Sequence, residues 1–344
     1  MKNPENFHPS VSKETRPLPI LRDILYCTAL AGKALIQDEF SSCFQQKETK
    51  TEFTVSYGWS MFCRYSLILP LRLPATLVIL LFYSILIILS RVVLRGIGSN
   101  LLLKLACKGL LWAMGVRAKH YGNKKKPDYP HVYIANHTTY MDYIILSSHR
   151  FAHSVIAQRQ DGFMSMLLKL VSGSVQFERK IKANRNEVKE EIRKLAQNAS
   201  IIVFPEGTCV NNEYTVMFQK GAFELGVPVC PVAIKYNKNL GDPYWNTKKQ
   251  SFTKHFIYLI TRWRTEVSVW WLPPMKAEEN ESAAEFATRV KKLISEKAGL
   301  KNLVWNGYLK HCKSPEEMKE IKRWGDQLTP TLLPETARKS SIDD

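Results

Sequence analysis

The chain has 344 residues, enough for one large domain, or one domain with an appendage, around a buried core. Lysine and arginine number 49 against 31 aspartates and glutamates, so the formal net charge of +18 favours anionic partners such as nucleic acid, lipid headgroups or phosphorylated small molecules. The seven cysteines are scattered without metal-ligand spacing, so we expect a reduced compartment and no zinc site.

The amino-terminal region, residues 1–63, holds two predicted segments. Residues 1–18 contain prolines and charges without an apolar core, which predicts a disordered arm and argues against a cleavable signal peptide. Residues 21–44 carry apolar side chains at mixed helical spacing, so we predict a helix there. Any membrane targeting then depends on a later segment.

That later segment is a run of 18 uncharged residues from Leu73 to Ser90, flanked by Arg72 and Arg91. As a helix it would be about 27 Å long, slightly less than a hydrocarbon core of roughly 30 Å. The run is apolar on every face, which favours a membrane helix over a buried core helix. A span of a thin bilayer and a re-entrant course both fit this length, so the number of membrane spans stays open.

A second apolar stretch and a basic cluster follow. Residues 99–116 place Lys104 and Lys108 four positions apart with leucines around the rest of the helix, a pattern typical of the membrane interface. Residues 117–126, RAKHYGNKKK, are interpreted as a basic loop, either solvated or in contact with anionic headgroups. Residues 64–126 are therefore predicted to form membrane-embedded and interfacial helices with a basic linker.

From residue 127 to residue 307, short β-rich runs alternate with helical stretches. The β-rich runs are HVYIAN, SVQFER, SIIVF, PVCPVAIKY and VSVWWLPPM, and the helical stretches are HTTYMDYIILSS, ANRNEVKEEIRKLAQN, QKGAFELG and ESAAEFATRVKKLISEKAG. This alternation predicts an α/β domain with a largely parallel central sheet flanked by helices. The last helix should begin at Asn280 or Ser282 and end at Gly299. Residues 308–344 are predicted to form a polar tail.

The stretch YIANHTTYMDYIIL, residues 133–146, places His137 and Asp142 between two apolar runs. Residues five apart do not share a face of a regular helix, so the two side chains meet only if His137 lies in the turn before a helix and Asp142 in its first turn. A carboxylate bound to one imidazole nitrogen would then leave the other nitrogen free to accept a proton from an alcohol. Alone the spacing is weak evidence, because a histidine at a strand end is more often structural.

Three further features strengthen this interpretation. The strand SIIVF ends in FPEGT, which places Glu206 and Gly207 at the same edge of the predicted sheet, although proline and glycine also mark ordinary turns. GSVQFER places Arg179 at another strand end, where a guanidinium is suited to bind phosphate, although surface arginines are common. VPVCPVAI, which contains Pro231, is otherwise a buried strand bounded by prolines.

These features resemble, in order and separation, the four sequence blocks of the glycerolipid acyltransferase family. The blocks are His137-x4-Asp142, Gly173-x3-Phe177-x-Arg179, Phe204-Pro205-Glu206-Gly207-Thr208 and VPVCPVAI. The longer stretches FPEGTCVNN, MFQKGAFELG, PVAIKYN, GDPYWN and WWLPPM resemble the glycerol-3-phosphate acyltransferases of the endoplasmic reticulum. The likeness covers about residues 133–307 and extends more loosely back to Arg64.

The resemblance implies an O-acyltransferase that uses acyl-CoA as co-substrate, without metal, cofactor or covalent intermediate. His137 would be the base that takes the proton from the acceptor hydroxyl, and Asp142 would orient it. Further residues are implied in substrate binding: Phe177 and Arg179 at the acceptor phosphate, Glu206 and Gly207 with Thr208 at its glycerol part, and Pro231 in the fourth block. We add Lys220 as a second phosphate ligand on electrostatic grounds, against the alternative of a surface lysine.

The resemblance further implies transfer to the sn-1 hydroxyl of glycerol 3-phosphate, giving lysophosphatidate, at the endoplasmic reticulum membrane with the active site facing the cytosol. Acyl-CoA is cytosolic, so we expect the sequons at Asn136, Asn198 and Asn280 to carry no glycan. Residues 248–265 combine basic and aromatic side chains, which indicates either contact with the bilayer near the active site or a half-buried helix.

Two other functions remain open at this stage. One is acylation of lysophosphatidate or another lysophospholipid, because the shared blocks recognise phosphate and glycerol in all these acceptors. The other is a non-catalytic basic protein that binds membranes or nucleic acid through its charge, although none of the zinc, RNA-binding or helix-turn-helix signatures is present in the sequence. The sequence does not reveal the oxyanion donors, the acyl-chain preference or the oligomeric state.

Overall fold

The computed structural model describes residues 39–46, 55–93, 98–122, 127–149, 154–158, 175–177 and 201–307, with 154–158 and 175–177 described through their backbone. The chain divides into two compact units. The first consists of Met1–Ser42 and Cys312–Asp344, and the second consists of Cys43–His311. In the first unit the short helix α2 (Glu39–Ser42) is described. The arm predicted at 1–18, most of the helix predicted at 21–44, the helix predicted at 183–198 and the tail predicted at 308–344 lie outside the described residues.

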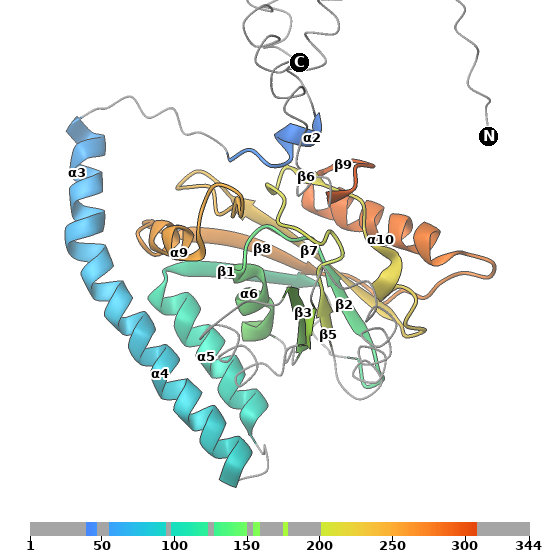
Figure 1. Cartoon of the computed structure of the whole chain (residues 1–344), viewed down its shortest axis with the longest axis horizontal. Helices are drawn as coiled ribbons and strands as arrows, with labels where there is room; N and C mark the ends of the chain where they lie inside the picture. Colours follow the sequence, from blue (N-terminus) through green and yellow to red (C-terminus); the bar gives the residue numbers. More distant parts are fainter. Residues whose placement is uncertain are drawn as a thin grey trace, which may run out of the picture. The chain divides into compact units, whose positions relative to one another are not determined.

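A seven-stranded sheet forms the centre of the second unit (Figure 1). The strands are β1 (Val116–Gly122), β2 (Val132–Ala135), β3 (Ser154–Gln158), β4 (Val175–Phe177), β5 (Ile201–Val203), β7 (Val229–Asn237) and β8 (Thr265–Trp271). Their order is β1-β8-β7-β2-β5-β3-β4, and every neighbouring pair is parallel except β7 and β8. The predicted α/β class with a largely parallel sheet is confirmed.

Helices cover both faces of this sheet. They are α5 (Ser99–Ala113), α6 (Met141–His149) and α9 (Phe252–Ile260) on one face and α10 (Ala283–Ala298) on the other. Alternation along β2 explains the two layers, because Val132 and Ile134 pack with α10 while Tyr133 and Ala135 pack with the other three helices. A small sheet of β6 (Tyr214–Thr215) and β9 (Lys301–Asn302) lies beside α10.

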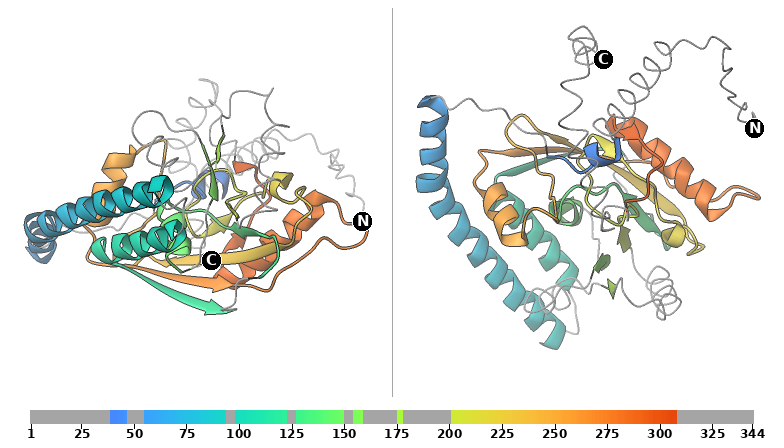
Figure 2. Two further views of the ribbon diagram at one scale, coloured as in Figure 1. Left: turned by 90° about the horizontal axis from the view of Figure 1, so that it is seen from below. Right: turned by 45° about the horizontal axis from the view of Figure 1, so that its top comes forward.

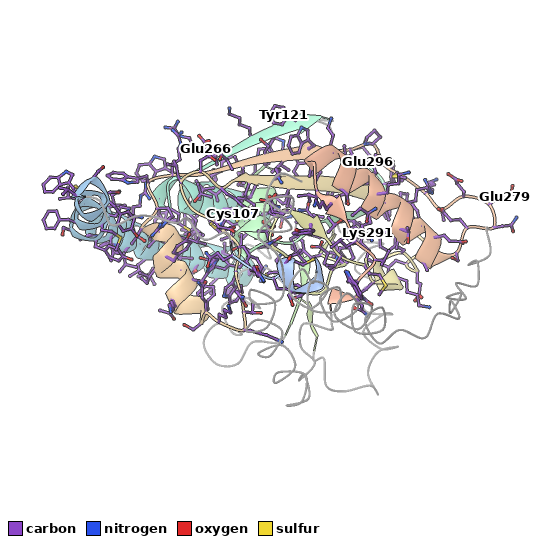
Figure 3. The ribbon with its side chains drawn as sticks, turned by 90° about the horizontal axis from the view of Figure 1, so that it is seen from above. Cys107, Tyr121, Glu266, Glu279, Lys291 and Glu296 are labelled. Carbon is purple, nitrogen blue, oxygen red and sulfur yellow. The ribbon has the colours of Figure 1, made fainter. Side chains whose placement is uncertain are left out.

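Local signals fix the ends of α10. Ser282 is the N-cap, and it forms a reciprocal capping box with Glu285. Gly299 ends the helix with a φ of 61°, in the left-handed region that favours glycine. Of the two predicted starting residues, Ser282 is therefore the one used. The helix exposes Glu296 to solvent and buries Lys291, whose ammonium donates a hydrogen bond to the Leu303 carbonyl (Figure 3).

The predicted apolar helix is confirmed and is longer than the uncharged run. The helix α3 (Val55–Cys63), a π-helical turn at Arg64–Ile68 and α4 (Leu69–Val93) form one continuous helical run of 39 residues. The π turn ends two residues before Pro70, which has no N–H to donate to the preceding turn. By length and composition, this is the one helix among the described residues that could cross a membrane.

Most of the apolar surface of this helix does not contact the rest of the protein. Only 17% of its most apolar 18-residue window is buried, although α4 runs beside α5 (Figure 2). Its exposed large apolar side chains include Trp59, Phe62, Leu67, Leu71, Leu77, Val78, Leu81, Phe82, Ile85, Leu89 and Val92. An apolar surface of this extent is typical of a protein that contacts lipid or a partner.

One arginine joins α4 to the helix α9. The Arg72 guanidinium donates hydrogen bonds to the carbonyls of Ile260, Arg262 and Trp263, which end and follow α9. Gly115 also approaches it so closely that an added Cβ would lie 2.3 Å from the guanidinium. The α5–β1 turn, α4 and α9 are therefore held together at one point.

Two predicted segments differ from the structure. Residues 117–122, interpreted as part of a basic loop, form the edge strand β1, which pairs with β8. Charged Arg117 and exposed Lys119 suggested a loop, but such residues are also common on edge strands, where they discourage further pairing. The stretch QKGAFELG forms only a 3₁₀ turn at Lys220–Ala222 rather than a helix. Strand β3 has no counterpart among the predicted elements.

Candidate active site

The candidate site lies where β2 and β5 end. These strands are parallel neighbours, with Ile134 opposite Val203, so their carboxyl ends share one edge of the sheet. Beyond β2 the chain reaches His137, and beyond β5 it reaches the segment 204–208. Open α/β sheets place their ligands at this edge.

His137 and Asp142 form the predicted pair. The His137 Nδ1 atom lies 3.0 Å from Oδ2 of Asp142. His137 lies in the turn before α6 and Asp142 in its first helical turn, which confirms the predicted geometry. The His137 side chain is 21% exposed whereas Asp142 is fully buried, so the imidazole is the member of the pair that reaches the surface.

Four donors hold the Asp142 carboxylate in place. Its Oδ2 atom accepts hydrogen bonds from the main-chain N–H groups of Thr138 (2.7 Å) and Thr139 (3.0 Å) in addition to its contact with His137. Its Oδ1 atom accepts a hydrogen bond from the Tyr236 hydroxyl at 2.6 Å. Both oxygens are therefore engaged, and the carboxylate can present Oδ2 to His137 in only one orientation.

The surroundings of His137 favour its protonated form. Burial lowers the pKa of His137, but the neighbouring Cys209 and the Asp142 carboxylate raise it, and the net pKa lies above its ordinary value. The Phe204 ring stacks on the imidazole, with ring centroids 4.3 Å apart. An imidazole so placed gains a proton readily when an alcohol is presented to its free nitrogen.

Glu206 supports the main chain of His137. Its Oε2 atom accepts a hydrogen bond from the His137 N–H at 2.7 Å, and its Oε1 atom accepts one from the Val216 N–H at 3.3 Å. Burial raises the pKa of the Glu206 carboxyl, while these two donors and the nearby imidazole oppose the rise. The carboxylate thus points at the protein backbone, and its predicted contact with the glycerol part of an acceptor stays a prediction.

Other predicted residues occupy varied positions. Gly207 has a φ of 67°, in the left-handed region that glycine adopts easily because it has no Cβ. Thr208 beside it is buried. Pro231 is buried inside β7 opposite Ile134. Lys220 is 68% exposed and pairs with Glu224 at 3.2 Å, which favours the surface-lysine alternative. Substrate contacts of all these residues remain predictions.

The predicted phosphate block is described only in part. Phe177 is the last residue of β4, which runs parallel to β3 and ends at the same edge of the sheet as β2 and β5. Arg179 lies outside the described residues.

Several polar residues that hold the site were not among the predicted ones. Tyr236 on β7 binds Asp142, and Asn212 donates hydrogen bonds to the Thr138 hydroxyl and the Ile234 carbonyl while accepting one from the Tyr236 N–H. The Asn136 amide is buried and exchanges two hydrogen bonds with the main chain of Ile234. The signal in the sequence was the concentration of asparagines beside the two motifs, NHTT and CVNN.

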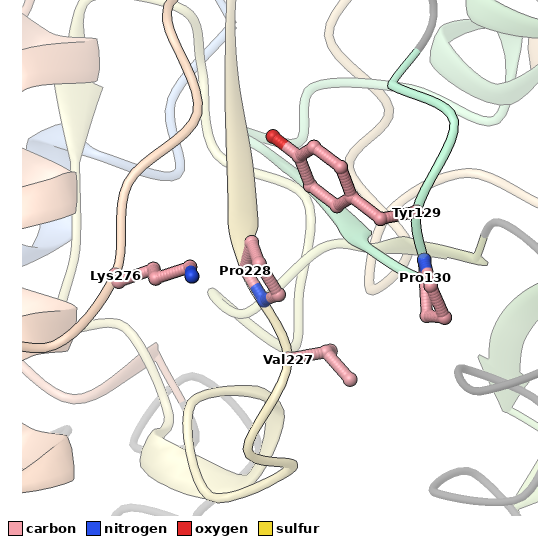
Figure 4. Close-up of a pocket in the computed structure, with 5 residues that line it drawn as sticks. All are labelled: Tyr129, Pro130, Val227, Pro228 and Lys276. Atoms are coloured by element: carbon pink, nitrogen blue, oxygen red, sulfur yellow. The ribbon is translucent and has the colours of Figure 1, made fainter.

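Metal ligands and a pocket at the opposite edge of the sheet are the other features that bear on the location of the site. In the described ranges, no group of three or more histidines, cysteines and acidic residues lies together as metal ligands would. An open pocket of about 420 Å³ is lined by Tyr129, Pro130, Val227, Pro228 and Lys276 (Figure 4). Because these residues precede β2 and β7 or follow β8, the pocket lies at the amino-terminal ends of β2 and β7, opposite the edge that carries His137.

Comparisons with known proteins agree with the four-block pattern. A family model described as Acyltransferase matches residues 117–235. Glycerol-3-phosphate acyltransferase 3 of Xenopus laevis is 30% identical over 326 residues, which cover 87% of this chain and 73% of that protein. Glycerol-3-phosphate acyltransferase 3 of Rattus norvegicus is 31% identical over 355 residues, 94% of this chain and 77% of that protein. Glycerol-3-phosphate acyltransferase 4 of Homo sapiens is 31% identical over 331 residues, 87% of this chain and 71% of that protein.

A solved structure was also matched. It is the 1-acyl-sn-glycerophosphate (LPA) acyltransferase PlsC of Thermotoga maritima, with a TM-score of 0.39 and 19% identity over 65% of this chain and 96% of that chain. This likeness is too distant for the substrate of that protein to bear on this one.

Proposed function

Because this chain belongs to the glycerol-3-phosphate acyltransferase family, we propose that it transfers a fatty acyl group from acyl-CoA to the sn-1 hydroxyl of glycerol 3-phosphate, giving lysophosphatidate. The chain is an acyltransferase. The observation that carries the proposed transfer chemistry is the pair of His137 and Asp142, joined at 3.0 Å, with the imidazole reaching the surface at the carboxyl edge of the sheet.

The proposed reaction is a direct transfer. The Nδ1–H group of His137 donates to Asp142, and Nε2 accepts the proton of the acceptor hydroxyl as its oxygen attacks the thioester carbon. The C–S bond of the tetrahedral intermediate then breaks, and the imidazolium returns its proton to the departing coenzyme A sulfur. The new ester forms without a covalent enzyme intermediate, since a thioester is already activated. The Asp142 carboxylate stabilises the imidazolium throughout.

The acceptor and the donor are bound through other residues in this proposal. We assign the acceptor phosphate to Phe177 and Arg179, and its glycerol part to the loop of Glu206, Gly207 and Thr208. No metal or cofactor takes part in the proposed chemistry, and acyl-CoA serves as co-substrate. The support for these assignments is the match of the residues to the family's sequence blocks.

An acceptor assay tests the proposed substrate. Membranes that contain the wild-type chain are given labelled acyl-CoA with either glycerol 3-phosphate or lysophosphatidate, and the lipid products are separated. We expect lysophosphatidate to form from the first acceptor, because the relatives that match most of this chain are glycerol-3-phosphate acyltransferases. Product from lysophosphatidate alone would move the substrate to the lysophospholipid class. Membranes without the chain are the control.

We place the enzyme at the endoplasmic reticulum membrane, with its active site facing the cytosol. The exposed apolar side of α3 and α4 supports membrane contact. Residues 248–265 are the second segment predicted to contact the membrane. Two of its arginines instead contact other residues of the protein: Arg262 lies over the Tyr258 ring at 4.3 Å, and Arg264 pairs with Glu266 at 2.7 Å. Contact of α9 with a bilayer stays a prediction.

The orientation is tested by glycosylation. The sequon at Asn280 is exposed, whereas the Asn136 side chain is buried with its amide bonded to Ile234, so Asn280 is the better reporter. With a cytosolic active site we expect the chain to carry no glycan at Asn280, and glycosidase treatment to leave its electrophoretic mobility unchanged. A shift that disappears in Asn280→Gln would place the domain in the lumen and contradict the proposed orientation.

A further inference from the structure

A buried histidine, His255, lies behind the catalytic pair. It is on α9, its side chain is fully buried, and its Nε2 atom lies 3.2 Å from the Thr139 hydroxyl. The main-chain N–H of the same Thr139 donates to Oδ2 of Asp142 at 3.0 Å. One residue thus joins His255 to the carboxylate that orients His137.

The direction of these hydrogen bonds follows from the neighbouring residues. The Gln250 amide nitrogen donates to Oε1 of Gln46 at 3.2 Å, so the Gln250 amide oxygen faces Nδ1 of His255, also at 3.2 Å. An amide oxygen only accepts, so Nδ1 carries the proton. The Nε2 atom of His255 is then an acceptor, and the Thr139 hydroxyl donates to it.

The environment keeps His255 neutral. Burial lowers the pKa of His255 to about 4, although the Pro243 carbonyl beside it opposes this. At neutral pH the imidazole therefore has one donor and one acceptor, as the hydrogen bonds require. No charge on His255 competes with His137 for the Asp142 carboxylate.

Trp245, which lies close to His255, also contacts Thr138, the residue before Thr139. The Trp245 N–H donates to the Thr138 carbonyl at 3.1 Å, and the Trp245 ring stacks on His255 with centroids 5.8 Å apart and planes 14° apart. Tyr140 meets the edge of the same imidazole at 5.8 Å. The segment from GDPYWN to α9 therefore contacts both Thr138 and Thr139.

We propose that His255 is a positioning residue for the reaction: as a neutral acceptor it fixes the Thr139 hydroxyl, and with it the main-chain N–H that holds Asp142 against His137. The inference deepens the proposed function, since it rests on His137 acting as the base. A purely structural role would instead make His255 a packing residue, with no preference for which ring nitrogen is kept.

Three substitutions of His255 separate these roles. Glutamine presents a carbonyl oxygen near the place of Nε2, asparagine presents its amide near the place of Nδ1, and phenylalanine fills the volume without either. We expect His255→Phe and His255→Asn to lower kcat by about 10- to 100-fold, because a small misplacement of a catalytic group has effects of this order. We expect His255→Gln to stay within about fivefold of wild type and all three to leave KM nearly unchanged.

A matched control and a double-mutant cycle complete the kinetic test. Ile260→Val is buried on the same helix and removes one methylene, which costs about 0.5–1.5 kcal/mol of stability without touching the hydrogen bonds, so its kcat should match wild type. The losses in Thr139→Val and His255→Phe should not add in the double variant, because both remove the same contact. Equal loss in His255→Gln and His255→Phe, or additive losses, would overturn the proposal.

A second readout does not depend on the acceptor or on turnover. Diethyl pyrocarbonate modifies neutral imidazoles, so the pH midpoint of His137 modification, followed on its peptide by mass spectrometry, reports the pKa of His137. Cys209 and Asp142 are the groups that raise the pKa of this imidazole, and the Glu206 carboxylate, which is bonded to the His137 main chain, interacts with it electrostatically. The midpoint should fall in His255→Phe and Thr139→Val and stay in His255→Gln. An unchanged midpoint in His255→Phe would refute the positioning role, whether or not the wild-type enzyme acylates either acceptor. Failure of the wild-type enzyme to acylate either acceptor would reject the proposed function and leave the positioning role to be decided by the midpoint.

Discussion

Alanine in place of His137 should lower the turnover of glycerol 3-phosphate acylation by about 100- to 10,000-fold, the usual contribution of a general base. The substitution removes the only side chain of the pair that reaches the surface, and Asp142 behind it is fully buried and engaged by other donors. Nothing else in the pair is placed to accept the proton. Initial rates at saturating acyl-CoA, measured on purified enzyme in detergent or nanodiscs, give the comparison.

A control histidine lies at the other end of the same strand. His131 precedes β2, and its Nδ1 atom lies 2.7 Å from the Tyr129 carbonyl, a contact that the amide of asparagine can replace. His131→Asn should therefore retain nearly the wild-type rate. Activity of His137→Ala near that of wild type, with equal amounts of folded enzyme, would remove His137 from the role of base.

Asparagine in place of Asp142 should be as damaging, with kcat lower by on the order of 1,000- to 10,000-fold, because a neutral amide does not stabilise the imidazolium that forms when His137 takes the proton. It should also destabilise the fold. With its oxygen in the place of Oδ2, the amide presents its nitrogen to the Tyr236 hydroxyl, which then loses its acceptor, and a buried donor without an acceptor costs about 1–3 kcal/mol. Rates and thermal unfolding of the same preparation separate the two effects.

The pH midpoint of activity should be lower in Asp142→Asn than in wild type. The base form of His137 is the active one, and its pKa is raised, so in wild type kcat/KM should increase with pH through a midpoint above the ordinary 6.5 of histidine. Removing the Asp142 charge takes away one of the causes that raise the pKa, so the midpoint of the residual activity should move to lower pH. Because Cys209, Asp142 and Glu206 interact electrostatically with His137, the measured midpoint belongs to this coupled group rather than to His137 alone. A midpoint that stayed in place would mean that Asp142 does not set the basicity of His137.

Tyr236→Phe is a milder change at the same carboxylate than Asp142→Asn. It leaves Oδ2 and its three contacts in place and removes only the phenol that donates to Oδ1. Its kcat should therefore fall much less than that of Asp142→Asn. Equal losses in the two variants would show that the orientation of the carboxylate depends chiefly on Oδ1.

The pair of His137 and Asp142 was predictable because its geometry is local. A strand, a turn and a helix start within ten residues bring His137 to Asp142, and the sequence HVYIANHTTYMD contains all three signals. Tyr236 was not predictable, since it lies 94 residues from Asp142 and reaches it only because β7 pairs with β2. His255, 116 residues from Thr139, depends on the same kind of long-range packing.

Glu206 illustrates a different limit of the sequence. A carboxylate at the end of a strand in a parallel sheet resembles a ligand-binding group, and its position was predicted correctly. Its orientation depends on the N–H groups of His137 and Val216, which come from two other segments of the chain. Sequence spacing locates such a residue at the edge of the sheet but does not tell whether it faces the substrate or the backbone.

The contact of Arg72 with the end of α9 has a mechanical consequence. Arg72 holds α4 to α9, and α9 in turn carries His255, which contacts the turn beside the catalytic pair. If α4 lies in a bilayer, the height of His137 above the lipid is then a fixed dimension of the fold. In that case, moving this arginine by one helical turn along α4 would shift His137 by about 5.4 Å along the axis of α4. The Arg72 contact would then set the depth at which the imidazole lies relative to the membrane surface.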